Sequence, residues 1–258
     1  MAMQLDKVVP WGRSKREYYG MFNLTDECLK QSIVGCGDGP ASFNAEMNSC
    51  GGHVVSCDPL YAIPGKDIYE LFSASVDEVL NQVRSTPERW VWKYHRDPDD
   101  LKHNRMEVMQ RFLTDYDQGT LENRYVIGEF PNLPFTDNQF DIALCSHFLF
   151  LYSEHFSETF HVRSVLEMCR VAHDTRIFPL LELDQTISRH LNAVCSAVTE
   201  AGYHPDIIPV DYELQKGGNK MLRITKCEQT EALNSHAFGT FGTSPAEQAL
   251  VPKASGSK

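Results

Sequence analysis

The sequence lacks the cysteine patterns that form metal and redox sites. Its eight cysteines include no CxxC pair, and several lie inside apolar runs such as DIALCSHF and VLEMCRV. A free cysteine in such a run behaves as a small hydrophobic side chain. Neither a zinc knuckle nor a dithiol redox motif is therefore indicated.

Long apolar segments are also lacking. The most apolar run, FDIALCSHFLFLY, is too short to span a bilayer and contains a histidine. The first twenty residues, MAMQLDKVVPWGRSKREYYG, have no apolar block of the kind found in signal peptides. These two observations favour a reducing, cytoplasmic setting and no membrane partner.

Positive charge is scarce. Lysine and arginine number 24 against 35 aspartates and glutamates, which gives a net charge of -11. A charge of this sign repels phosphate backbones and anionic membranes over distance. With 42% hydrophobic residues in 258, the composition is that of a globular protein, and a nucleic-acid partner is disfavoured.

The order of apolar segments predicts an α/β fold. Strands are expected around residues 31–34 and in the segments HVVSCD, RYVIGE, FDIALCSH, RIFPLLEL, DIIPV and NKMLRIT. The run FDIALCSH is almost continuously apolar, as in a strand buried on both faces. The last two segments are joined only by DYELQKGG, which is too short for a parallel crossover, so this pair must be antiparallel. We expect a doubly wound, mostly parallel seven-stranded sheet that ends in an antiparallel hairpin.

Helices are expected between these strands and before the first of them. Ser14 and Glu17 have capping-box spacing, and a second helix is expected from Pro40. Residues 59–123 are far more than a short crossover needs, so they are predicted to be a helical insertion. Within it, Ser75 and Glu78 again have capping-box spacing. The predicted organisation is an N-terminal helical segment (1–30), an α/β domain (31–227) and a disordered tail (228–258).

A glycine-rich turn, IVGCGDGPASF, follows the first predicted strand. It contains no GxxxxGK[ST] phosphate loop, and the third glycine position of a GxGxxG dinucleotide motif is Pro40. The turn instead has the pattern GxGxG. Asp58 lies 19 residues after Gly39, at the end of the second predicted strand. A carboxylate in that place is more typical of a residue that binds the two hydroxyls of a ribose than of a solvated acid in a loop.

Three segments together resemble the ordered motifs of class I S-adenosylmethionine-dependent methyltransferases, of the type-11-like motif set. They are IVGCGDGPASF, VVSCDPLY and YVIGEFPNLPFTDNQFDIALCSHFLFLY. The segment LPFTDNQFDIALCSH is the most specific of these. The ending YHPDIIPVDYELQKGGNKMLRIT is similar to the reversed hairpin that closes the sheet in that superfamily. The resemblance covers residues 31–227, apart from most of the insertion.

The resemblance implies a set of cofactor-binding residues. The backbone of the glycine turn would pass against the methionine and ribose parts of S-adenosylmethionine, Asp58 would hold the ribose, and its neighbours would flank the adenine. Ser146 would face the methionine end, and an aromatic residue of the N-terminal helix would lie over the cofactor as part of a lid. The full set is Gly35, Cys36, Gly37, Gly39, Asp58, Pro59, Leu60, Glu129, Phe130, Ser146, Tyr18 and Tyr19.

The sequence departs from the family pattern at one place. The family usually has an acidic residue two positions before the first glycine, and here that position is Ile33. Asp38 or a residue of the N-terminal helix is a candidate to replace it as the partner of the methionine amino group.

Methyl transfer from a sulfonium requires mainly alignment, and a base helps where the acceptor must lose a proton. His147, directly after the fourth strand, is the candidate base. The aromatic residues Trp90, Trp92 and Tyr94 of the insertion either line the acceptor pocket or hold the insertion together. The leading hypothesis is a methyltransferase that acts on a small molecule, without a metal. Two alternatives stay open: an NAD(P)-dependent oxidoreductase, and a non-catalytic regulatory protein that binds S-adenosylmethionine.

Overall fold

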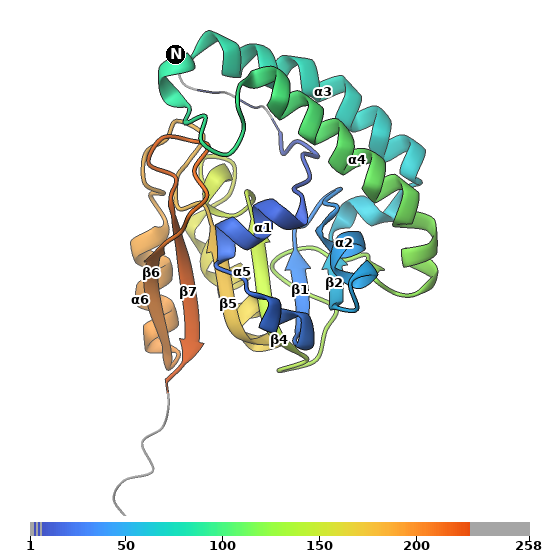
Figure 1. Ribbon diagram of the computed structural model, residues 1–258. Helices are drawn as coiled ribbons and strands as arrows, with labels where there is room; N and C mark the ends of the chain where they lie inside the picture. Colours follow the sequence, from blue (N-terminus) through green and yellow to red (C-terminus); the bar gives the residue numbers. More distant parts are fainter. Residues whose placement is uncertain (1–2, 4, 6, 228–258) are drawn as a thin grey trace, which may run out of the picture. The chain divides into compact units, whose positions relative to one another are not determined.

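A seven-stranded sheet forms the centre of the protein in the computed structural model, which describes residues 3, 5 and 7–227 (Figure 1). The strands are β1 (Ser32–Cys36), β2 (His53–Cys57), β3 (Tyr125–Val126), β4 (Phe140–Ser146), β5 (Ala172–Phe178), β6 (Tyr203–Pro209) and β7 (Lys220–Lys226). Their spatial order is β3-β2-β1-β4-β5-β7-β6. The predicted tail, residues 228–258, lies outside the described residues.

All neighbouring strands are parallel except β7, which is antiparallel to both β5 and β6. The β6–β7 register pairs Tyr203 with Lys226 and Pro209 with Lys220. A connection of ten residues between these strands leaves no room for a crossover helix, and the hairpin therefore reverses. The predicted fold class is confirmed: the sheet is doubly wound and mostly parallel, it has seven strands, and its last two strands form an antiparallel hairpin.

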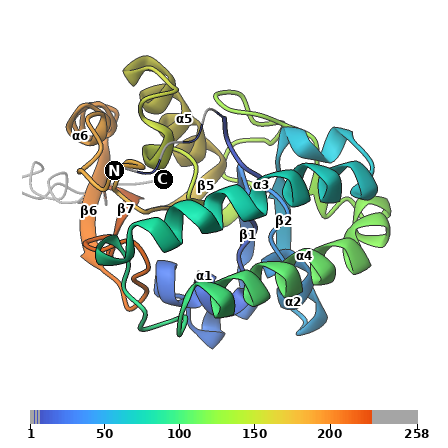
Figure 2. The same cartoon turned by 90° about the horizontal axis from the view of Figure 1, so that it is seen from above.

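Helices cover both faces of the sheet (Figure 2). On one face, α1 (Lys15–Phe22) and α2 (Phe43–Ser49) share a buried cluster with Ile33 and Ile142. On the other face, α5 (Glu158–Val171) and α6 (Leu191–Glu200) pack on the opposite side of the same strands. Strand β4 lies between the two clusters and is almost fully buried, as its apolar sequence predicts.

The insertion consists mainly of two long helices, α3 (Gly65–Ser85) and α4 (Pro98–Leu121). They lie side by side across the C-terminal ends of the strands (Figure 1). Short 3₁₀ helices stand at both ends of α3, at Pro59–Ala62 and Pro87–Arg89, and others at Asp26–Lys30 and Phe150–Tyr152. The insertion is thus helical, as expected, and it forms a roof over the C-terminal edge of the sheet.

Several local predictions were wrong. Ser75 is not a helix cap, because α3 runs through it: the buried stripe along this helix is continuous from Ile68 to Val83. The Ser75 hydroxyl donates instead to the carbonyl of Phe72 within the helix. Helix α2 begins at Phe43 rather than at Pro40. Ile187 has helical spacing to Leu191 and Val194, which suggests that it belongs to the same helix, but it precedes α6 and is 69% exposed. The capping box of Ser14 and Glu17, by contrast, is formed as predicted.

Candidate active site

A cavity of about 590 Å³ lies at the C-terminal edge of the sheet. The loops after β1, β2 and β4 form its floor, with residues 37–39, 58–60 and 146–148. Helix α3 and residues 7–13, which precede α1, complete the wall. A volume of this size is within the range of pockets that hold small-molecule ligands.

The glycine turn is shaped by its backbone angles. Gly37 and Gly39 have φ values of +63° and +55°, which side chains other than glycine adopt rarely. Both line the cavity, and the space over Gly39 is open: an added Cβ would meet no heavy atom within 4 Å. A ligand can therefore approach the backbone at Gly39 closely.

Gly35 has a different role from the one expected. An added Cβ at Gly35 would come within 2.5 Å of both carboxylate oxygens of Asp38, whose side chain folds back over the end of β1. Gly35 itself does not line the cavity, and neither does Cys36, which is fully buried. The first glycine thus makes room for an acidic side chain of the same protein.

Asp38 is a buried acid that lines the cavity. Its carboxylate accepts hydrogen bonds from the hydroxyls of Tyr18 and Ser56, the latter at 2.5 Å. Burial raises the pKa of Asp38 from 3.8 to about 6, although these two hydrogen bonds lower it, and the neighbouring charge of Asp58 adds to the rise.

Asp58 follows β2 and lines the cavity together with Pro59 and Leu60. Its two carboxylate oxygens accept from the backbone N–H groups of Gly39 at 2.9 Å and Leu60 at 2.8 Å. Burial raises the pKa of Asp58 above its usual value. Each carboxylate oxygen has a second lone pair, so both can still accept from ligand hydroxyls.

Glu129 and Phe130 also line the cavity, next to the loop that carries Asp58. The ring of Phe130 stacks on that of Phe148, with centroids 5.9 Å apart and an angle of 8° between the planes. Together they give this side of the cavity a flat apolar surface, which suits a planar ring.

Ser146 and His147 stand at the end of β4 and line the cavity. His147 has a positive φ of 53°, held by its backbone N–H, which donates to Phe178 at 2.7 Å. Its Nδ1 lies 3.0 Å from the Ser146 hydroxyl, which itself donates to the sulfur of Met21. The contact between Ser146 and Nδ1 is compatible with either ring tautomer; with the proton on Nδ1, Nε2 is left as the acceptor.

Burial, and then the positive charges of Arg13 and Arg105, lower the pKa of His147 well below its usual value. The imidazole is therefore neutral at physiological pH and can accept a hydrogen bond or a proton.

Tyr18 and Tyr19 do not line the cavity. Tyr18 stacks on Phe43, with ring centroids 4.2 Å apart, and its hydroxyl reaches Asp38 from beneath. The Tyr19 hydroxyl points instead to the sulfur of Met47, at 3.8 Å. Helix α1 packs on one face of the sheet, so these two rings are not brought over the cavity; Tyr18 acts on it only through Asp38.

The residues ahead of α1 were missed by sequence reasoning. Trp11 and Arg13 line the cavity because residues 9–13 cross over the glycine turn. Gly12 permits this crossing, since a Cβ there would overlap the carbonyl of Pro40, and the backbone of Ser42 donates to the carbonyl of Arg13 at 3.1 Å. The nearest sequence signal is the isolated glycine of PWGR, and no motif marks the arginine.

The remaining wall is apolar. It is formed by side chains of α3, of the segment around Trp90, of the loops after β4 and β5, and of the start of α5: Leu71, Val79, Val83, Trp90, Leu151, Phe156, Phe160 and Leu183. Of the three insertion aromatics singled out above, Trp90 lines the cavity and Trp92 and Tyr94 do not. A ligand that fills the cavity therefore meets polar groups at the sheet edge and an apolar chamber beneath α3.

Within residues 3, 5 and 7–227, no group of three or more histidine, cysteine, aspartate or glutamate side chains is placed to hold a metal ion. Over the same part of the chain, no helix has the length and apolarity required to cross a membrane.

Solved structures to which the chain is similar include a biosynthetic protein and two proteins described as methyltransferases. The pyocyanin biosynthetic protein PhzM gives a TM-score of 0.44 at 12% identity, with 83% of this chain and 54% of PhzM covered. A putative S-adenosyl-L-methionine-dependent methyltransferase of Methanococcus maripaludis gives 0.42 at 12% identity, with 83% and 84% covered. Magnesium protoporphyrin IX methyltransferase of Synechocystis gives 0.40 at 9% identity, with 77% and 71% covered.

At such scores and identities these likenesses carry no conclusion about activity, and the chain spans about half the length of PhzM. No protein-family model matches the sequence.

One curated protein is far more similar in sequence. It is 32% identical over 225 residues, which are 87% of this chain and 99% of that protein. The chain thus belongs to the same family as the uncharacterized protein MJ0045 of Methanocaldococcus jannaschii.

Proposed function

We propose that the protein is an S-adenosylmethionine-dependent methyltransferase that transfers a methyl group to a small-molecule acceptor. One observation carries this proposal: Asp58, the open backbone at Gly39 and the pair Ser146–His147 line a single cavity at the C-terminal edge of the sheet. In open α/β sheets this edge is where ligands bind.

The lining residues fit such a cofactor. Asp58 retains free lone pairs for the two ribose hydroxyls. The stacked rings of Phe130 and Phe148 offer a flat surface beside it for the adenine. We assign the end of β4, with Ser146 and His147, to the reacting methyl group.

The bound cofactor would supply an activated methyl carbon and a neutral thioether as the leaving group. The contribution of the protein is to hold the acceptor atom in line with that carbon while the apolar roof excludes water. Where the acceptor is a hydroxyl, thiol or ammonium group, its proton passes to Nε2 of His147, which is neutral beforehand.

The acceptor enters the chamber beneath α3. Val79, Leu151 and Leu183 belong to one apolar cluster there. This chamber favours an acceptor with an apolar body over a polar polymer. The net charge of -11 is a further argument against a nucleic acid.

A nicotinamide-dependent oxidoreductase is less well supported. The usual dinucleotide-binding sheet has the parallel order 3-2-1-4-5-6, whereas here the reversed β7 lies between β5 and β6. A regulatory protein that binds the cofactor without chemistry would need no neutral histidine at the end of β4.

Calorimetry separates these three functions. We expect S-adenosylmethionine and its demethylated product, S-adenosylhomocysteine, to bind, and NAD not to bind. NAD binding without either sulfur compound would overturn the proposal. Binding of both sulfur compounds, with no methyl transfer to any of a broad panel of apolar metabolites, would favour the regulator.

The role of Asp58 gives a sharper test. Asp58→Ala should weaken S-adenosylhomocysteine binding by at least about 1.5 kcal/mol, because hydrogen bonds to a charged group are lost. Asp117→Asn, an exposed change on α4, is the charge-matched control and should leave the affinity unchanged. Equal affinities of wild type and Asp58→Ala, with both proteins folded by circular dichroism, would remove Asp58 from the site.

A further inference from the structure

Position 33 provides no acid at the cavity. Ile33 is fully buried in β1, where it pairs with Val54 and Ile142, and it does not line the cavity. An amino-acid end of a bound cofactor must therefore be held by other side chains. The charged residues of the lining are Lys7, Arg13, Asp38, Asp58 and Glu129.

Two of these five stand out by their burial and position. Lys7 is exposed, and Asp58 and Glu129 follow β2 and β3, on the side assigned to the adenosine. Arg13 is 7% exposed and Asp38 is 6% exposed, and they lie at the glycine turn after β1. Buried charges are rare unless they are paired.

Arg13 has no acidic partner among the residues that the structure describes. Its Nη1 donates to the carbonyls of Trp11 and Gly12, and its Nε is buried without a partner among the described residues. The nearby Glu17 is already taken by the bidentate pair with Arg105. Within residues 3, 5 and 7–227, Arg13 is thus a buried cation at the cavity that forms no ion pair with a carboxylate.

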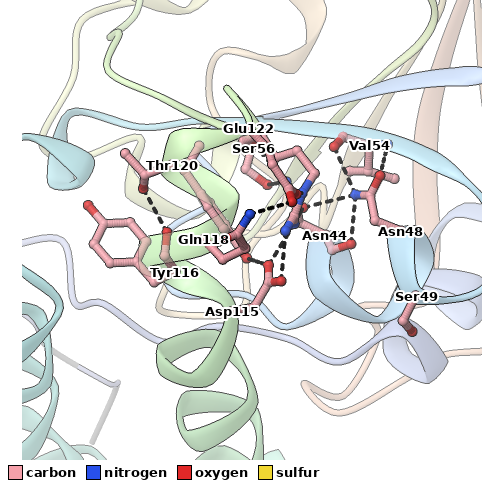
Figure 3. A network of polar contacts seen from close by, with 12 residues as sticks. Asn44, Asn48, Ser49, Val54, Ser56, Asp115, Tyr116, Gln118, Thr120 and Glu122 are labelled. Atoms are coloured by element: carbon pink, nitrogen blue, oxygen red, sulfur yellow. Dashed lines mark hydrogen bonds and ion pairs between the residues drawn. The ribbon is translucent and has the colours of Figure 1, made fainter.

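Asp38 is the complementary case. It has no cationic partner within the described part of the chain; it accepts only from the hydroxyls of Tyr18 and Ser56. Ser56 in turn accepts from Asn44 at 3.2 Å, and Asn44 accepts from Arg124, which is paired with Asp115. Figure 3 shows the part of this network that contains Asn44, Ser56 and Asp115. The Ser56 hydroxyl, which is contacted by Asn44, donates to the Asp38 carboxylate.

Arg13 and Asp38 are close to the same side chain without forming an ion pair with each other. The Tyr18 hydroxyl donates to Asp38, and the charge of Arg13 acts on Tyr18 and on His147. An α-amino acid carries a carboxylate and an ammonium group on one carbon. A cation and an acid that are separate, buried and unpaired match these two groups.

We propose that Arg13 binds the carboxylate and Asp38 the ammonium group of the cofactor's amino-acid end, in place of an acid at position 33. This inference rests on the proposed function. It also gives the residues ahead of α1 a part in binding: they carry the carboxylate ligand across the glycine turn.

The test compares three adenosine thioethers by calorimetry. S-adenosylhomocysteine has both charged groups, its decarboxylated analogue has only the ammonium group, and 5′-methylthioadenosine has neither. Arg13→Met should lower the affinity for S-adenosylhomocysteine at least about 10-fold and leave the affinities for the decarboxylated analogue and 5′-methylthioadenosine unchanged. Asp38→Asn should lower the affinities for S-adenosylhomocysteine and the decarboxylated analogue by about the same factor and leave that for 5′-methylthioadenosine unchanged.

The three ligands also provide the controls. Unchanged 5′-methylthioadenosine affinity shows that a variant is folded with an intact adenosine site. Arg163→Met on α5 and Asp117→Asn on α4 are exposed, charge-matched changes that should alter none of the three affinities. Arg13→Lys, which keeps the charge, should recover part of the lost affinity.

Two results would overturn the inference while the proposed function stands. One is unchanged S-adenosylhomocysteine affinity in both variants, and the other is an equal loss for all three ligands. Failure of every adenosine thioether to bind the wild-type protein would overturn the proposed function, and the inference with it.

Discussion

At the scale of single residues, the contact between Gly35 and Asp38 best explains the glycine turn. The first glycine of the turn is required because the Asp38 carboxylate lies where a side chain would begin. The second and third, Gly37 and Gly39, line the cavity with positive φ values. One sequence pattern therefore serves two purposes, which are internal packing of an acid and exposure of backbone to a ligand.

Burial of Asp38 has a measurable consequence for stability. Its pKa is about 6 in the folded state and 3.8 without the fold, so the folded state binds more protons between these two values. Stability should therefore fall as the pH rises from 3.8 to 6, by about 1.4 kcal/mol per pH unit and about 3 kcal/mol in total, through this residue alone. Above pH 6 the effect is constant.

Urea denaturation of wild type and Asp38→Asn at several pH values isolates this contribution, because groups that titrate alike in both proteins cancel. We expect the wild type to lose stability relative to Asp38→Asn over pH 4–6. A constant difference between the two proteins across this range would show that Asp38 titrates in the folded state as it does in the unfolded chain.

His147 should behave in the opposite way, since its pKa is lowered by burial and by Arg13 and Arg105. Its ring resonances in NMR spectra should show no titration near pH 6.5, the value of an unperturbed histidine. Because the unfolded chain binds a proton there and the folded state does not, the stabilising effect of the neutral ring is present above pH 6.5 and is lost as the pH falls. A midpoint near pH 6.5 for His147 would contradict the buried, neutral ring.

At the scale of elements, a buried ion pair joins the insertion to the N-terminal helix. Arg105 of α4 binds Glu17 of α1 through both Nη atoms, at 2.8 and 2.6 Å, and both side chains are fully buried. The Tyr212 hydroxyl donates to the same carboxylate at 3.1 Å. Although burial alone would raise the pKa of Glu17, Arg105 holds it well below its usual value. The pair fixes α4 beside the cavity.

Loss of one partner should be costly. Arg105→Met leaves the Glu17 carboxylate buried without its cation and should destabilise the protein by about 3 to 5 kcal/mol in urea denaturation. Arg111→Met on the same helix removes a more exposed pair, with Glu46 at 3.6 Å, and should cost less than about 1 kcal/mol. Adding Glu17→Gln to Arg105→Met should restore part of the stability, because the uncompensated charge is then absent. Equal, small effects of the two arginine changes would contradict a structural role for this pair.

The sheet was predictable from sequence because most strands contain a short apolar run bounded by turn residues. The bounds of β5 were not: it spans Ala172–Phe178 and ends before Pro179, within the predicted segment RIFPLLEL. The short link between β6 and β7 even determined their direction. Helix bounds were less predictable: Ser75 has capping-box spacing, but its hydroxyl bonds within α3 because packing of Val76, Val79 and Val83 continues the helix through it.

The site was predictable only in part. Residues next to strand ends, such as Asp58 and His147, were placed at the cavity by the topology of parallel strands. Arg13 and Trp11 were not, because they reach the cavity through a crossing of two loops, and such long-range contacts leave no spacing in the sequence. The expected lid of Tyr18 and Tyr19 failed to form over the cavity for the same reason, since the face on which α1 packs is decided by tertiary contacts.

At the scale of the whole chain, the strand order and the position of the cavity are both consistent with the proposed function. The reversed strand β7 lies between β5 and β6, and the cavity lies at the C-terminal edge of the sheet, with α3 above it. Polar groups gather at the strand ends and apolar groups under the insertion. Under the proposed function, the cofactor would occupy the polar part and the acceptor the apolar part, with His147 between them.

A crystal structure of the protein with S-adenosylhomocysteine tests this account most directly. We predict that the ribose hydroxyls lie within hydrogen-bond distance of the Asp58 carboxylate, with the sulfur directed toward Ser146 and His147 and open to the chamber beneath α3. A ligand bound elsewhere, or a sulfur turned away from the end of β4, would contradict it.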